Sequence, residues 1–357
     1  MRAFLSRRPV RLAIAAVIAI VVVVTPLTSS PFINYQLSTV AVIAVALLGL
    51  NIVMGYAGQV SLGQSAFLGL GAYIAAYGVG HGWPIPLVFV LCCVIPALVG
   101  MLVALAAARL RGLALAMVTI ALPIIGVPLA KRFPDFTGGS QGTTVSWLSA
   151  PDWSGLADDQ WRYYVVIVIA ALLFVLGRNL VRGRIGRAFA IVKANEAVGI
   201  SMGISPYRYK VLAFTIAALF GGAAGFLYIA VVQYTSPETL SFGTSINLVV
   251  AMVIGGSASI VGTILGAFYY ILAPSLIGSI SPSSTALISG AVLLVILFLL
   301  PQGLASLPRR IVRVVHRRRG RRVPPRARNL PVDGVAQHAT AAPDSQKSPR
   351  EKEEEAE

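Results

Sequence analysis

A long stretch of the sequence that carries a single charge constrains the fold most. Between Val211 and Pro308 there is no lysine or arginine, and Glu238 carries the only charge. Such a stretch cannot form the surface of a soluble domain, in which about 25% of residues are charged. The whole chain of 357 residues is 57% hydrophobic and only 12% charged. The sequence therefore predicts an integral membrane protein.

The apolar windows have the length of membrane-spanning helices. A helix needs roughly 20 apolar residues to span a bilayer, whereas the strands of a barrel would alternate polar and apolar residues. The sequence lacks that alternation. Apolar windows fall at residues 11–27, 37–54, 66–80, 85–108, 113–130, 161–177, 211–232, 246–273 and 284–300. We therefore predict an all-α polytopic membrane protein.

Basic residues orient these spans, because short loops rich in lysine and arginine stay in the cytoplasm. The number of spans between two cytoplasmic segments must be even. The window 246–273 is therefore expected to divide at GGSASIVG, residues 255–262, and the run GYAGQVSLGQ is expected to form another inner turn. The count gives about ten helices, with broken or re-entrant segments and with both termini in the cytoplasm.

The region 131–160 is the exception, because Lys131 and Arg132 lie in a loop that the count places outside. Its acids and tryptophans favour an external loop whose aromatic rings lie at the membrane interface. These residues are Asp135, Asp152, Asp158, Asp159, Trp147, Trp153 and Trp161. We keep the external assignment.

The chain divides into a transmembrane domain, 1–308, and a tail, 309–357. The apolar segment near the N-terminus has a basic flank but no cleavage site, which predicts an uncleaved first helix. The tail begins with an arginine-rich block and ends with KSPREKEEEAE, and blocks of like charge stay disordered. Beside a membrane such a basic block is attracted to anionic lipid, which we favour over nucleic acid as its partner.

One run, NIVMGYAGQVSLGQSAFLGLGAYIAA at 51–76, places amides and glycines in an apolar sequence. Non-helical backbone at membrane depth needs protein or a water-filled cavity around it, so the run predicts a broken helix near a pathway. Close helix packing is the alternative for glycines, as at Gly221 and Gly225. Gln59 and Gln64 favour the pathway, because amides facing lipid are costly. The candidate pathway and motif residues are Asn51, Gly55, Gly58, Gln59, Ser61, Gly63, Gln64, Gly255 and Gly256.

The predicted spans lack the residues that catalysis or ion coupling requires. Carriers driven by protons or sodium usually keep carboxylates or histidines there, and a serine nucleophile needs a base. Cys92 and Cys93 are adjacent and have no further ligands for a metal. No G-x-x-x-x-G-K-[ST] phosphate loop occurs. We predict a transport subunit that is not an enzyme, needs no cofactor and receives its energy from another subunit.

The segment 178–210 is predicted to be the main cytoplasmic loop. It carries seven basic residues against one acid, Glu196. Its second half, RAFAIVKANEAVGISMGISPYRYK, has the pattern of one or two short amphipathic helices. Such helices either lie on anionic lipid or dock to a soluble partner, and the residues alone leave both alternatives open.

Three motifs, in this order, resemble the permease subunits of ABC importers for branched-chain amino acids, of the LivM-type branch. They are the run at 51–76, then GRAFAIVKANEAVGISMGISPYRYKVLAFTIAALFGGAAGFLY, then GGSASIVGTILGAF. The resemblance extends from about residue 37 to residue 305. It implies a ten-helix fold similar to that of the cobalamin importers, in a bacterial cell membrane. It also implies a second, LivH-like permease, two cytoplasmic ATPases and an extracytoplasmic binding protein as partners.

The same resemblance implies how the chain is driven and what it carries. Glu196, Ala197 and Gly203 match a glutamate-alanine-glycine element that couples such permeases to the ATPase, although its spacing differs from the general importer pattern. Arg187 is assigned to the same coupling segment. The implied substrates are leucine, isoleucine and valine. Urea or short-chain amide import, a stand-alone facilitator and a membrane scaffold are the alternatives.

Overall fold

The computed structural model describes residues 20–107, 113–280, 290 and 303–306. The chain divides into two units, Met1–Arg310 and Ile311–Glu357, and all described residues belong to the first. The predicted first span, 11–27, is described only from residue 20, where a helical segment runs to residue 28. The predicted last span, 284–300, and the tail lie outside the described residues except for residue 290. The count of ten helices therefore stays a prediction.

The described elements are helices joined by short connections, with a single two-stranded pairing among them. In order they are α3 (Pro31–Leu50), η1 (Asn51–Tyr56), α4 (Gln64–Gly80), α5 (Ile85–Ala107), α6 (Leu113–Arg132), α7 (Pro134–Thr137), η2 (Gly139–Gln141), β1 (Thr143–Thr144), η3 (Asp152–Ser154), α8 (Asp158–Arg182), α9 (Arg184–Ala194), α10 (Glu196–Ser201), α11 (Pro206–Val232), β2 (Tyr234–Thr235), η4 (Pro237–Leu240), α12 (Phe242–Gly255), α13 (Ile260–Ile280) and η6 (Leu304–Ser306).

Prolines and polar side chains mark the starts of several helices. Pro31 and Pro206 occupy the first turns of α3 and α11, where the missing N–H costs no hydrogen bond. The side chains of Asn195 and Ser241 accept backbone N–H groups at the starts of α10 and α12. Prolines also lie inside α5, α6 and α13, and membrane helices tolerate such positions because neighbouring helices support the freed backbone groups.

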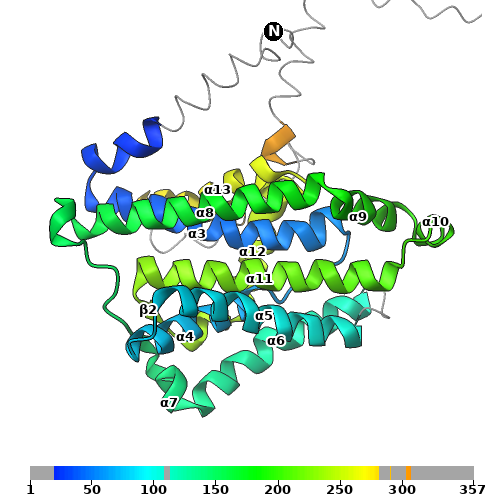
Figure 1. The fold of residues 1–357 in the computed structure, drawn as a ribbon, viewed down its shortest axis with the longest axis horizontal. Coiled ribbons are helices and arrows are strands. Elements are labelled where there is room, and N and C mark those ends of the chain that lie inside the picture. Colours follow the sequence, from blue (N-terminus) through cyan, green and yellow to red (C-terminus); the bar gives the residue numbers. More distant parts are fainter. Residues whose placement is uncertain (1–19, 108–112, 281–289, 291–302, 307–357) are drawn as a thin grey trace, which may run out of the picture. The chain divides into compact units, whose positions relative to one another are not determined.

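Helix α11 lies at the centre of the bundle, where it packs against α3, α4 and α5 (Figure 1). Helix α3 also contacts α8 and α13. In the part of the chain that the structure describes, five helices are long and apolar enough to cross a membrane: Pro31–Tyr56, Ile85–Ala107, Ala114–Arg132, Asp158–Arg182 and Pro206–Val232. Shorter apolar helices follow at Phe242–Gly255 and Ile260–Leu276. The prediction of an all-α polytopic membrane protein is confirmed.

Both predicted interruptions of the spans are present. Helix α3 continues into η1, a π-helical turn, after which residues 57–63 are not helical until α4 begins at Gln64. The second interruption lies between the end of α12 at Gly255 and the start of α13 at Ile260. We call residues 51–63 the broken segment and residues 256–259 the second break.

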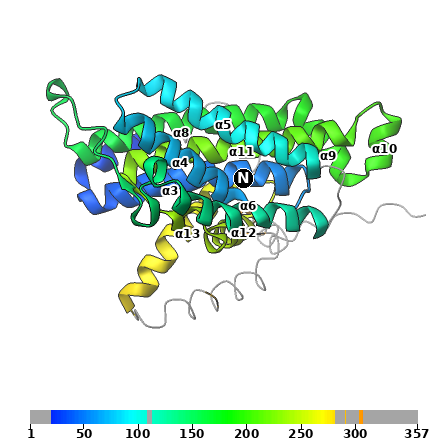
Figure 2. The same ribbon diagram turned by 90° about the horizontal axis from the view of Figure 1, so that it is seen from below.

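The two ends of the bundle carry different structures. At one end, α7 and the antiparallel pairing of Thr143 with Thr235 in β1 and β2 form a small cap. At the opposite end, α9 and α10 extend beyond the other helices (Figures 1 and 2). The segment 178–210 contains two short helices, as its pattern predicts, although α8 extends into it as far as Arg182 and α11 begins in it at Pro206.

One tryptophan of the loop between α6 and α8 differs from the prediction. Trp147 is buried, with its ring centroid 5.0 Å from that of Phe226, so its assignment to the membrane interface is wrong. Its carbonyl accepts a hydrogen bond from the side chain of Gln233, and the β1–β2 pairing holds the same loop against α11. Trp153, by contrast, is 81% exposed.

Candidate functional site

Asn51 joins the broken segment to the second break. Its Oδ1 accepts a hydrogen bond from Ala258 N at 2.8 Å, and its Nδ2 donates to Ser259 O at 3.0 Å. The side chain is fully buried. Gly55 lies directly against this contact, because a Cβ atom there would collide with Asn51 Oδ1. Two motifs that lie about 200 positions apart in the sequence are therefore held together by one amide.

Replacing Asn51 by alanine is expected to destabilise the protein by about 1–3 kcal/mol, the usual cost of leaving buried backbone groups without their partners. Thermal unfolding of the purified protein in detergent would measure this. Asn179 is exposed on α8, so Asn179→Ala is the matched control and should change stability by less than about 0.5 kcal/mol. Equal stability of the two variants would contradict the role given to Asn51.

The other amides of the broken segment and of the start of α4 bind backbone oxygens of neighbouring helices. Gln59 Nε2 donates to Lys210 O at 3.3 Å. Gln64 Nε2 donates to Ala46 O of α3 at 3.1 Å and to Ala217 O of α11 at 3.2 Å. Gln64 thus links three helices at the point where α4 begins. Neither glutamine faces a bilayer, because both side chains are buried in protein.

Ser61 and Gly63 lie where the broken segment meets α6. Ser61 is buried, and the next residue, Leu62, donates its N–H to Thr119 Oγ1 at 3.0 Å. A Cβ atom on Gly63 would lie 2.8 Å from Thr119 O. Asn51, Gln59, Ser61 and Gln64 are thus all buried inside the protein, and their contact with a moving solute stays a prediction.

Glycines at the two breaks have conformations that other residues rarely adopt. Gly256 has φ +115° at the end of α12, and Gly58 has φ +72° in the broken segment. Gly255 has no room for a side chain, because a Cβ atom would collide with Gly262 O. Both glycine-rich motifs therefore allow a sharp change of chain direction, and Gly255 also allows α13 to approach α12 closely.

The α9–α10 segment is attached to the broken segment by two lysines. Lys193 Nζ donates to Gly55 O at 2.6 Å. Lys210 is largely buried, and its Nζ forms an ion pair with Glu196 Oε1 at 2.7 Å while its carbonyl binds Gln59. Sequence reasoning missed both lysines. Their partners are a backbone carbonyl and a distant side chain, and no local pattern indicates either one.

The remaining predicted coupling residues lie on the exposed side of this segment. Arg187 of α9 and Ala197 of α10 are exposed. Gly203 follows α10 with φ +76°, and a Cβ atom there would meet no other atom within 4 Å. Asn195 Oδ1 caps α10 by accepting Ala197 N at 2.9 Å. Three apolar side chains of α10 and its C-terminal turn are also exposed, namely Val198, Ile200 and Met202. We call the surface formed by Val198, Ile200 and Met202 the α10 face.

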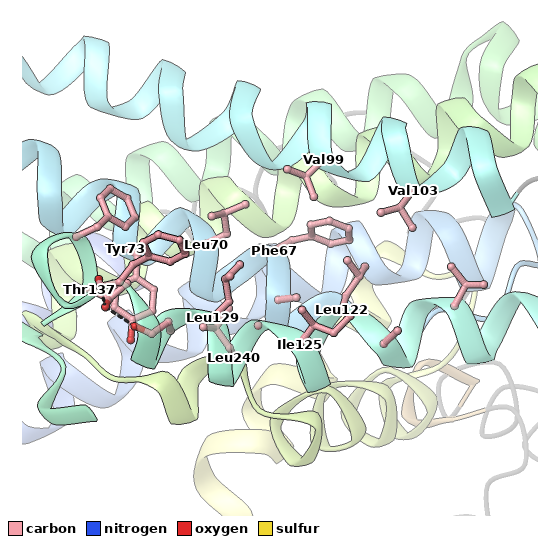
Figure 3. Close-up of a pocket in the computed structure, with 17 residues that line it drawn as sticks. Phe67, Leu70, Tyr73, Val99, Val103, Leu122, Ile125, Leu129, Thr137 and Leu240 are labelled. Atoms are coloured by element: carbon pink, nitrogen blue, oxygen red, sulfur yellow. Dashed lines mark hydrogen bonds between the residues drawn. The ribbon is translucent and has the colours of Figure 1, made fainter. Parts of the chain in front are cut away.

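A large apolar cavity lies between α4, α5 and α6. It has a volume of about 660 Å³, and Figure 3 shows Phe67 and Leu70 of α4 on one side and Leu122 and Ile125 of α6 on the other. Its walls are almost entirely apolar side chains. Tyr73, which also lines it, is buried and its hydroxyl has no hydrogen-bond partner among the described residues.

A second cavity, which we call the tyrosine cavity, lies between α3, α4, α11, η4, α12 and α13 and has a volume of about 370 Å³. Glu238 is the one charged residue among the described residues that line it. The others divide into hydroxyl-bearing and apolar side chains: Tyr35, Thr39, Tyr228, Ser236, Thr239, Thr244 and Tyr270, with Ile43, Leu68, Val232 and Ile271. The predicted pathway residues of the broken segment line neither cavity.

Comparison with known proteins identifies the family. Residues 32–299 match the family model described as "Branched-chain amino acid transport system / permease component". The chain is 31% identical over 307 residues to the high-affinity branched-chain amino acid transport system permease protein LivM of Salmonella typhimurium strain LT2, covering 77% of this chain and 71% of that protein. LivM of Escherichia coli strain K12 is 31% identical over 304 residues, covering 77% and 70%.

More distant similarities extend over less of the chain or are weaker. The autoinducer 2 import system permease protein LsrC of Klebsiella pneumoniae is 32% identical over 123 residues, covering 34% of each chain. Among solved structures, PsaBC from Streptococcus pneumoniae in complex with Fab has a TM-score of 0.41 at 18% identity, covering 77% of this chain and 94% of that one. The match to the family model and to LivM confirms the prediction of a permease subunit. The chain belongs to the family of branched-chain amino acid transport system permease components.

Proposed function

We propose that this chain is the LivM-type permease subunit of an ATP-driven importer that carries leucine, isoleucine and valine across a bacterial cytoplasmic membrane. The observation that carries the proposal is the match to the family over 32–299, together with 31% identity to two LivM proteins. In this proposal the partners are a second, LivH-like permease, two cytoplasmic ATPases and an extracytoplasmic binding protein. Both termini lie in the cytoplasm.

The α10 face supports the assignment of the ATPase contact. Val198, Ile200 and Met202 are 49%, 64% and 65% exposed, at the end of the bundle that carries most of the basic residues that the structure describes. Basic loops stay on the cytoplasmic side, where lipid tails do not cover such apolar side chains. An apolar helix face of this kind is suited to a groove of a soluble partner. Glu196, Ala197, Gly203 and Arg187 lie on or beside this face, at the proposed contact.

The tyrosine cavity supports a substrate with both an ammonium group and an alkyl side chain. Glu238 offers a carboxylate for an ammonium group, and the hydroxyl groups offer donors for a carboxylate. The apolar half of the lining, including Ile43 and Val232, is suited to a branched alkyl chain. Its volume of about 370 Å³ lies in the range of small-molecule sites. Urea has no alkyl part to occupy the apolar half, so the cavity favours an amino acid over urea.

Uptake by cells that lack this chain tests the proposal. We expect deletion to reduce uptake of labelled leucine at low concentration to the background level and re-expression of the full chain to restore it. An excess of unlabelled isoleucine or valine should suppress the restored uptake, whereas an excess of urea should not. Unchanged leucine uptake after deletion, or suppression by urea, would contradict the proposed substrate. Restored uptake without ATPase partners would instead indicate a stand-alone facilitator.

A further inference from the structure

We propose that Lys193 is a positioning residue that transmits movement of the α9–α10 segment to the broken segment inside the membrane. The proposal rests on the proposed function, because it assumes that an ATPase moves α10. It adds a residue that the coupling motif does not contain. Lys193 lies in the last turn of α9, three residues before Glu196.

The first step of the argument is the contact itself. Lys193 Nζ donates to Gly55 O at 2.6 Å, a carbonyl near the end of the π-helical turn. The last carbonyls of a helix have no partner within it, and a positive charge at that end is favourable. The lysine side chain also lies along the broken segment, because a Cβ atom on Gly58 would lie 2.7 Å from Lys193 Cγ.

A second, independent connection runs to the same segment from α10. Glu196 binds Lys210 at 2.7 Å, and the carbonyl of Lys210 accepts the side chain of Gln59. Helix α9 also packs directly against η1. A displacement of α9 and α10 therefore reaches the broken segment at two places, Gly55 and Gln59, which lie on either side of Gly58.

The broken segment is in turn connected to the second break. Asn51 binds Ala258 N and Ser259 O. The backbone of the turn between α12 and α13 is therefore expected to move together with the π-helical turn. Regular helix hydrogen bonds are interrupted at both breaks, and helices bend most readily at such interruptions. Lys193 thus contacts the broken segment, which is connected to the second break, at the point where a movement of α9 and α10 would be transmitted to both.

The alternative is that Lys193 only caps the π-helical turn and stabilises the fold. The two roles differ in what a substitution changes. Loss of a cap lowers the amount of folded protein and leaves each folded complex working normally. Loss of transmission leaves the complex assembled but separates ATP hydrolysis from transport.

The test uses the complete complex, with the second permease, both ATPases and the binding protein, reconstituted in lipid vesicles. For Lys193→Met we expect the ratio of leucine transported to ATP hydrolysed to fall about tenfold, a typical size for coupling between sites. The assembled complex should keep its ATP hydrolysis. Lys193→Arg should restore most of the ratio, because its guanidinium also donates to a carbonyl. Lys131→Met, at the opposite end of the bundle, is the matched control and should leave the ratio unchanged.

Two results would overturn the inference. One is a normal ratio for Lys193→Met, and the other is a loss of transport and hydrolysis in proportion to the loss of assembled complex. Because the ratio is measured per assembled complex, a partly folded variant still gives an answer. A wild-type complex that transports no leucine would defeat the proposed function instead, so the two failures are distinguishable.

Discussion

Leucine uptake is expected to fall a hundredfold or more when Glu196 is replaced by arginine, while the protein still inserts into the membrane. The ion pair with Lys210 at 2.7 Å becomes a repulsion between two cations. The negative charge in the first turn of α10 is lost as well, and that position favours acids. A loss of about a hundredfold lies in the upper part of the range observed for coupling between sites. Uptake by cells that contain equal amounts of membrane-inserted variant and wild-type protein measures it.

A charge swap separates the two roles that Glu196 could have. If the residue acts only through its ion pair, the double variant Glu196→Lys with Lys210→Glu should recover uptake, because the pair is restored in reverse. If Glu196 also contacts the ATPase, as we propose, the double variant should remain inactive. Normal uptake by Glu196→Arg alone would remove Glu196 from the coupling assignment. Gly203→Arg should also lower uptake, because it places a bulky cation beside the same face and a side chain at φ +76°, where side chains are strained.

The positions of the spans and of their interruptions could be predicted from the sequence, because both depend on local composition. Apolar windows indicated α5, α6, α8 and α11 to within a few residues of their ends. The glycines and amides at 55–64 and the glycines at 255–262 indicated two breaks, and the structure has both. The amphipathic pattern at 187–210 likewise predicted one or two short helices, and the structure has α9 and α10. Each of these features is decided by residues near one another in the chain.

The partners of the polar side chains could not be predicted, because they depend on which helices come together. Asn51 binds residues 207 and 208 positions away, and Lys193 binds a carbonyl 138 positions away. Sequence reasoning considered Asn51 and the glutamines as candidates to line a pathway, whereas the structure shows what holds them in place. Lys193 had no distinguishing signal, since a lysine on an amphipathic helix usually points to water. The burial of Trp147 could not be predicted either, because only the tertiary fold brings Phe226 beside it.

The sequence allowed two interpretations of the glycines, a broken helix and close helix packing. The small residues of α4 and α11 show the second. A Cβ atom on Gly71 would collide with Gly222 O, and one on Gly225 would collide with Leu68 O. The backbones of α4 and α11 therefore touch along this line, as expected for helix packing through small residues. Helix α5 joins the same contact, because Cys92 Sγ donates to Gly71 O at 3.3 Å. The glycines of the breaks and those of the helix contacts thus have different roles.

The largest loss of stability is expected from Gly222→Val, at the point where α11 meets α5. Its Cβ atom would collide with Cys92 O and would lie 2.6 Å from Pro96 Cγ. Overpacking in a core typically costs about 1–3 kcal/mol, and the cost here should exceed about 3 kcal/mol because the obstructing oxygen belongs to the backbone and cannot rotate away. We expect little monodisperse protein in detergent extracts, measured by size-exclusion chromatography of equal amounts of membrane.

Gly80→Ala is the matched control for this substitution. Gly80 is also a helical glycine, at the end of α4, but it is exposed and a Cβ atom there would meet nothing within 4 Å. This change should be within about 0.5 kcal/mol of neutral, as for most surface substitutions. If Gly222→Val gave as much monodisperse protein as Gly80→Ala, α5 and α11 would have to lie farther apart than the structure places them. The close three-helix contact supports α4 and, through Gln64, the start of the broken segment, so uptake by any residual Gly222→Val protein should also be impaired.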